Sequence, residues 1–127
     1  MKHYNLEFQG YTWDRFFHVI ADKQGILAIY SGRLDNEGQV KMDSLLSVSY
    51  EERFSGLFDC KRVEEFRNKI SPTQMLFYSY ADVDKEVGKD ISDYINSLLN
   101  KERTNDEFKV LCSGACALFP ETIIKNV

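Results

Sequence analysis

Cysteine and histidine are the residue types best suited to metal or redox chemistry, and their spacing limits what they could do in this chain. Cys112 and Cys116 are four residues apart, as in half of a metal site, whereas His3 and His18 are both far away in sequence. A structural zinc site takes four ligands. With Cys60 the number of cysteines is odd, so a disulfide framework is not expected. The sequence predicts reduced thiols packed in the interior.

Phosphate binding is a second chemistry that charged residues could support. The net charge of the chain is −4 at pH 7, so its average field repels phosphate backbones. Basic residues gather in the segment 61–69, but Glu64 and Glu65 are interleaved with them. This pattern predicts a solvated helix face with internal charge pairs, and it argues against a general nucleic-acid coat protein.

Charge and apolar content also predict how the chain is organised. The first twenty residues carry several charges and lack the apolar core of a signal peptide. No apolar run approaches the roughly 20 residues of a membrane span. The hydrophobic content of 43% is enough for a real core. We therefore expect one domain over residues 1–127, in the cytoplasm and without a membrane contact.

The first half of the chain is expected to be rich in strands. Alternating apolar and polar residues predict a strand over 4–9, closed by Gly10, and aromatic residues at helical spacing predict a helix or turn over 13–20. Apolar segments at 25–34 and 40–48 flank turn-forming residues at 35–38 and predict a β-hairpin.

Helices are expected to dominate the second half. A helix is predicted from about residue 50 to 58, and another from 62 to 70, where Pro72 stops it. The segment 74–83 is predicted to be a strand buried on both faces, and 85–103 an amphipathic helix with an apolar stripe that includes Ile91. A last strand is predicted over 108–118, interrupted by Gly114.

This order of elements resembles the GIY-YIG nuclease family over about residues 25–106. Gly25-Ile26-Leu27 stands where the family has Gly-Ile-Tyr, and Ser47-Val48-Ser49 where it has Tyr-Ile-Gly. Arg53 matches the arginine of the following helix, and Asn105 matches the downstream asparagine. The tail 114–117 is similar to that of bacterial relatives. The resemblance implies an α/β (α+β) fold, in which helices flank a small, mostly antiparallel central sheet built on an N-terminal hairpin core.

The reaction implied by the resemblance is metal-dependent hydrolysis of a DNA phosphodiester. In the family a tyrosine activates or positions water, the arginine stabilises phosphoryl charge, and a glutamate holds a divalent cation such as Mg²⁺ or Mn²⁺. Both motif tyrosines are replaced here, by Leu27 and Ser47. Leucine has no hydroxyl, and the serine side chain is too short to bring its hydroxyl to the place of the tyrosine oxygen. Tyr30 and Tyr50 are the nearby substitutes. Tyr30, three residues from Leu27, would need a bulge to face the same side.

The metal position has two alternative matches. Counting back from Asn105 gives Asp93, whereas the apolar register of the helix gives Ile91, which cannot bind a cation. Asp93 lies roughly 200° around the helix from Ile91, on the polar side, which favours a solvated residue. Arg53 has Glu51 and Glu52 as neighbours that could compete for it, and Asn105 could be an ordinary turn residue.

Three functional hypotheses follow from the sequence. The one we favour is a degenerate, catalytically inactive GIY-YIG-like domain that needs no cofactor and binds an unknown protein partner or makes weak DNA contacts. The alternative is a weak endonuclease that uses Mg²⁺ or Mn²⁺ with Arg53, Asp93, Asn105 and a replacement for the lost tyrosine. A third hypothesis is an unrelated small α/β domain that contains a hairpin.

Overall fold

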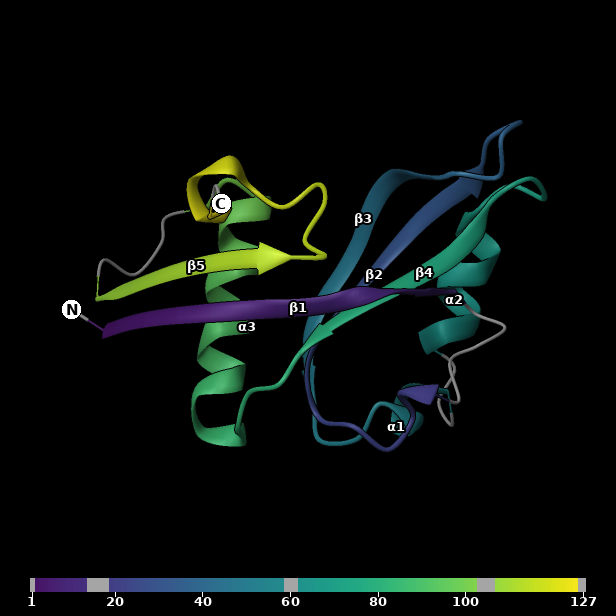
Figure 1. Ribbon diagram of the computed structural model, residues 1–127. Helices are drawn as coiled ribbons and strands as arrows, with labels where there is room; N and C mark the ends of the chain where they lie inside the picture. Colours follow the sequence, from purple (N-terminus) through teal and green to yellow (C-terminus); the bar gives the residue numbers. More distant parts are fainter. Residues whose placement is uncertain (1, 14–18, 59–61, 103–106, 126–127) are drawn as a thin grey trace.

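The computed structural model describes residues 2–13, 19–58, 62–102 and 107–125. It is a mixed α+β domain built on one curled five-stranded sheet (Figure 1), which confirms the predicted fold class. The strands are β1 (Lys2–Trp13), β2 (Gly25–Leu34), β3 (Val40–Glu51), β4 (Met75–Ala81) and β5 (Phe108–Gly114). The helices are α1 (Ser55–Phe58), α2 (Arg62–Lys69), α3 (Lys85–Leu99) and the 3-10 turn η2 (Glu121–Ile123).

The sheet has the strand order β3-β2-β4-β1-β5, with only the β1–β5 pair parallel. β1 changes partner along its length. Its first half pairs with β5 from Lys2 to Phe8, and its second half pairs with β4 from Gln9 to Trp13. In Figure 1 this long strand runs from beside β5 to beside β4. β1 therefore joins the last strand to the rest of the sheet.

The predicted β-hairpin is confirmed as β2 and β3, which lie at one edge of the sheet. Gly38 closes the turn with a φ of 79°, a conformation that glycine adopts without steric cost. The pairing has register shifts between Ile29 and Tyr30 and between Ser31 and Gly32, whereas β2 pairs with β4 without a shift. The irregularities thus belong to the edge strand β3.

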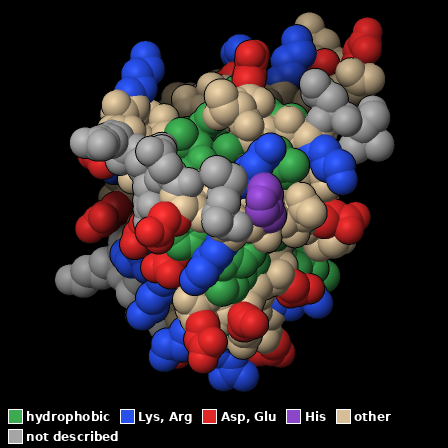
Figure 2. Space-filling view, turned by 90° about the vertical axis from the view of Figure 1, so that its left-hand side faces the viewer, with side chains coloured by type: hydrophobic (Ala, Val, Ile, Leu, Met, Phe, Trp, Pro, Cys, Tyr) green, Lys and Arg blue, Asp and Glu red, His purple; other side chains and the backbone are tan. Residues whose placement is uncertain are grey.

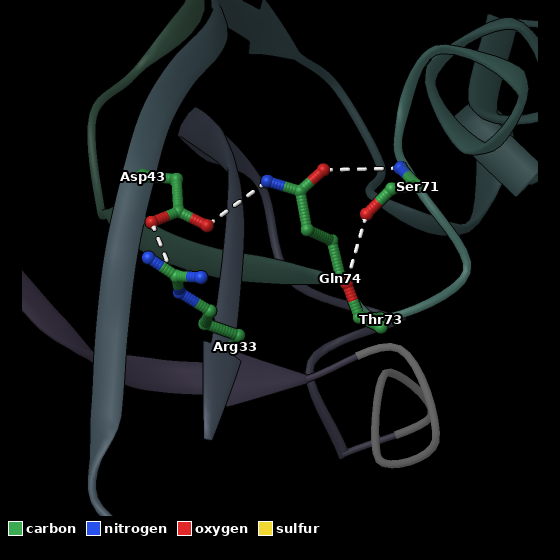
Figure 3. Close-up of polar contacts among 5 residues, drawn as sticks. All are labelled: Arg33, Asp43, Ser71, Thr73 and Gln74. Atoms are coloured by element: carbon green, nitrogen blue, oxygen red, sulfur yellow. Dashed lines mark hydrogen bonds and ion pairs between the residues drawn. The ribbon is translucent and has the colours of Figure 1, made fainter. Parts of the chain in front are cut away.

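Polar contacts fasten this hairpin to the turn that precedes β4 (Figure 3). The Gln74 side-chain amide donates to Asp43 at 2.9 Å, and its oxygen accepts the Ser71 backbone N–H at 3.0 Å. Asp43 also lies 3.6 Å from Arg33 on the neighbouring strand. These contacts tie the beginning of β3 to the turn before β4.

Two apolar clusters cover the two faces of the sheet. One contains Ile26, Ala28 and Tyr30 of β2, together with the α3 residues Ile91 and Ile95. The other contains Leu27 and Ile29 of β2, with Phe54 before α1 and Val63 of α2. Both faces of β4 contribute to these clusters, which confirms the prediction that this strand is buried on both sides. α3 and the pair α1 and α2 therefore lie on opposite faces.

Several predicted boundaries were wrong. The first strand does not close at Gly10 but continues to Trp13, because the chain gains a new partner in β4 there. Trp13 is thus strand rather than the start of a helix, and most of the predicted helix lies outside the described residues. β3 runs on to Glu51 because Glu51 pairs with Gly25, so the following helix is only the single turn α1.

The later elements follow the predictions more closely. α2 matches the predicted helix, and the apolar stripe of α3 is confirmed because Ile91 and Ile95 are fully buried. α3 ends at Leu99 rather than near 103, and β5 ends at Gly114, where the backbone turns with a φ of 82°. Cys112 and Cys116 are free, buried thiols, which confirms the prediction for these two residues. Cys60 lies outside the described residues.

Candidate functional site

An open cleft of about 400 Å³ lies at the end of β3. It is lined by Tyr50, Glu51, Glu52, Arg53, Gly56 and Lys89. Five of these residues belong to the segment from the end of β3 into α1, and Lys89 comes from the second turn of α3. The cleft therefore depends on the packing of α3 beside β3.

Tyr50 reaches the cleft from the face of β3 that α3 covers. It pairs with Ile26, whose side chain belongs to the apolar cluster under α3. The Tyr50 ring lies against Gly88, where an added Cβ would be 2.3 Å from the ring atom Cδ2. A glycine at position 88 thus lets the ring lie directly on the helix backbone and fixes its orientation.

Glu51 points to the opposite face and connects β3 to α2. Its carboxylate accepts a hydrogen bond from Arg62 Nη1 at 2.7 Å and another from the Ser49 hydroxyl at 3.2 Å. Only 16% of the Glu51 side chain is exposed. This carboxylate therefore has its own cation, supplied by a residue outside the cleft lining.

Glu52 is likewise paired with a cation from outside the lining. Its carboxylate oxygen is 2.5 Å from Lys85 Nζ at the start of α3. The hydrogen bond from Lys85 lowers the pKa of Glu52, and Lys89 adds a weaker electrostatic contribution in the same direction. The same bond raises the pKa of Lys85. Glu52 therefore remains ionised and paired near neutral pH.

The two cations of the lining are less well compensated. Arg53 lies 3.7 Å from Asp22, whose carboxylate is 91% exposed. Within the described part of the chain, no ion pair engages Lys89 and no hydrogen bond engages the Tyr50 hydroxyl. The cleft thus presents a guanidinium, an ammonium and a phenol, all of which can donate hydrogen bonds to an anion.

The two replaced motif positions, Leu27 and Ser47, and the substitute Tyr30 lie away from this cleft, whereas the substitute Tyr50 lines it. Leu27 and Tyr30 are both fully buried, but in the apolar clusters on opposite faces of the sheet. β2 is regular against β4 through this segment, so no bulge turns Tyr30 to the side of Leu27. Ser47 is half-buried in β3 and pairs with Ile29, on the face that α1 and α2 cover.

The two alternatives for the metal position differ in burial. Asp93 is exposed, whereas Ile91 is fully buried under the sheet, as the helical wheel predicts. Asn105 lies outside the described residues. Across residues 2–13, 19–58, 62–102 and 107–125, no group of three or more histidine, cysteine, aspartate or glutamate side chains could hold a metal ion.

Of the proposed site residues that the structure describes, only Arg53 lines the cleft. Tyr50, the second substitute tyrosine, joins it there. Sequence reasoning did not single out Lys89 or Gly88, because both act through the contact between α3 and the end of β3. In the sequence, a lysine that follows a glycine on the polar side of a predicted helix does not by itself indicate a binding site.

Comparisons with protein-family models, with curated proteins and with solved structures found no match for this chain. The GIY-YIG resemblance thus rests on the residues and on the order of elements. In the described residues no helix is long and apolar enough to cross a membrane.

Proposed function

We propose that this chain is a GIY-YIG-like domain that has lost catalysis and works in the cytoplasm as a binding module. The observation that carries the proposal is the complete burial of Leu27. At this position the family has the tyrosine of its first motif, and here the side chain is part of an apolar cluster with Ile29 and Phe54. A position enclosed in this way has no access to water or substrate.

The order of elements supports the family part of the proposal. The hairpin is followed by α1 and α2, then by β4 next to β2, and then by α3 on the sheet. The dispersal of the candidate residues supports the loss of catalysis. Tyr30 and Ser47 lie on opposite faces of the sheet, and Asp93 is on the exposed side of α3.

A weak metal-dependent nuclease is the second candidate, and one observation favours it. Tyr50 and Arg53 line one cleft together with two carboxylates, and a phenol, a guanidinium and a metal-binding carboxylate are the groups that such a reaction uses. However, Glu51 and Glu52 each already bind a cation. A metal ion would have to displace Arg62 or Lys85.

Nicking of supercoiled plasmid and cleavage of branched DNA, each with Mg²⁺ or Mn²⁺, distinguish the two candidates. We expect no cleavage above a buffer control. Metal-dependent cleavage that is lost in Arg53→Ala or Asp93→Ala, and retained in the matched Arg33→Ala, would contradict the proposal. Arg33 is a suitable control because it is an exposed arginine on the hairpin, paired with Asp43 away from the cleft.

A partner-binding role can be tested separately from catalysis. Figure 2 shows acidic and basic side chains interspersed around separate apolar areas on one face of the molecule. A surface of this kind suits polar, specific contacts better than a broad apolar interface. We expect the purified domain to bind a defined ligand or partner without changing it chemically.

A further inference from the structure

We infer that the cleft between β3, α1 and α3 binds the phosphate group of a small molecule through Lys89, Arg53 and the Tyr50 hydroxyl. This inference rests on the proposed binding function and names the class of ligand. It assigns the contact to Lys89 and Tyr50, which lie outside the positions matched to the nuclease motifs. No metal ion is required.

The charges around the cleft carry the first step of the argument. Each carboxylate of the lining is bound by a cation from outside it, Glu51 by Arg62 at 2.7 Å and Glu52 by Lys85 at 2.5 Å. Within each ion pair the negative and positive charges compensate each other. The remaining charges of the lining are the positive charges of Arg53 and Lys89. An oxyanion in the cleft would therefore meet two cations whose own compensation within the described residues is weak.

The position of the Tyr50 ring carries the second step. Its contact with Gly88 holds the ring on the backbone of α3, one residue before Lys89. The Tyr50 ring and the residue that carries the ammonium thus lie next to each other along α3, and both line the cleft. Because the ring is already packed, little conformational entropy is lost when the hydroxyl donates to a ligand.

Size and net charge favour a small molecule over a polymer. The cleft has a volume of about 400 Å³ and is open to solvent, so it has room for a small phosphate-bearing group but does not enclose a long ligand. The net charge of −4 opposes a long polyanion, which needs several phosphate contacts along its length. A ligand with a single phosphate or diphosphate group requires only the local cations of the cleft.

Titration by NMR, with chelator present to remove divalent metals, tests this inference. The probes are inorganic phosphate, pyrophosphate and adenosine 5′-monophosphate, with a single-stranded oligonucleotide as the polymer arm. We expect saturable shifts of the Tyr50, Gly56 and Lys89 amides with pyrophosphate or the nucleotide. Lys89→Gln and Tyr50→Phe should each weaken binding about tenfold, the effect of losing a hydrogen bond to a charged group.

Lys41→Gln is the matched control, because it removes one exposed lysine of the hairpin far from the cleft lining. Retained melting temperatures would show that Lys89→Gln and Tyr50→Phe are folded. Equal weakening by Lys41→Gln, no saturable binding of the small probes, or tighter binding of the oligonucleotide would each overturn the inference. Such results leave the proposed loss of catalysis intact, since that fails only on metal-dependent cleavage.

Discussion

At the scale of single residues, a close approach between two backbones explains one position that matches the nuclease motif. Gly25 matches the first residue of the family motif, yet it has a structural reason of its own. Its φ is 137°, and an added Cβ would lie 2.0 Å from the Ala81 carbonyl oxygen. Only glycine allows β2 to begin so close to the end of β4, so this match carries no information on catalysis.

Gly88→Ala should destabilise the domain by about 1–2 kcal/mol. An added methyl group collides with the Tyr50 ring, and overpacking of this kind costs about 1–3 kcal/mol, partly offset by the higher helix propensity of alanine. Denaturant unfolding measures the change. Gly56→Ala is the control, since a methyl group there meets no atom, and equal stability of the two variants would show that the ring can move aside.

Ser79→Ala should stabilise the domain by about 1 kcal/mol. The Ser79 hydroxyl is fully buried in the sheet, and no hydrogen-bond partner reaches it from the residues that the structure describes. An unsatisfied buried polar group costs about 1–3 kcal/mol. Alanine removes this cost and leaves only a small cavity. Thermal and denaturant unfolding provide the measurement, and a clear loss of stability would mean that the hydroxyl is satisfied in solution.

At the scale of elements, the edge strand β3 has features that disfavour pairing with a strand of another chain. Its two register shifts interrupt the regular row of backbone groups, and Asn96 of α3 donates to the Val48 carbonyl oxygen at 2.7 Å. Bulges and covered backbone groups are common protections of sheet edges. We therefore expect no partner to be recruited by addition of a strand to β3.

An ion pair between Arg62 and Glu51 links α2 to the end of β3. Arg62→Gln should destabilise the domain by about 1 kcal/mol, because it leaves the partly buried Glu51 carboxylate without its cation. Arg33→Gln should cost less, since its contact with Asp43 is longer, at 3.6 Å. Denaturant unfolding of both variants measures the two losses of stability. A larger loss in Arg33→Gln than in Arg62→Gln would contradict the prediction.

Local patterns allowed most elements to be predicted, and long-range contacts explain the errors. Glycine and asparagine in the turn 35–38 specify the hairpin, and the spacing of Ile91 and Ile95 specifies α3. The change of partner strand along β1 near Gly10 could not be predicted from the sequence. Alternation of apolar and polar residues indicates a strand but does not indicate which strand pairs with it. Of the cleft, Arg53 and Tyr50 were within reach of sequence reasoning. Lys89 was not, because only tertiary packing brings it to them.

At the scale of the whole molecule, the buried thiols connect stability to pH. Burial raises the pKa of Cys112 from the ordinary 9.0 to about 12, with a smaller contribution from Cys116. The folded state therefore keeps the proton after the unfolded state has lost it. This contribution to stability is complete below pH 9 and is lost as the pH rises toward 12.

The free energy of unfolding, measured by denaturant between pH 8 and pH 11, should therefore fall less steeply in Cys112→Ala than in the unaltered protein. Comparison of slopes removes the effects of lysine and tyrosine titration that both proteins share. In native protein at pH 8 we also expect Cys112 to react slowly with thiol reagents, because the thiolate is the reactive form. Rapid modification, or identical slopes, would mean that the thiol is accessible.

The position of β1 between β4 and β5 has a consequence for biosynthesis. Its first half pairs in parallel with residues 108–114, which leave the ribosome more than a hundred residues later. Until then the early segment can dock only through its contacts with β4, and its remaining backbone groups are open to solvent. Cotranslational assembly should thus pause at a four-stranded intermediate and finish only after residues 108–114 have emerged, when this non-local contact can close.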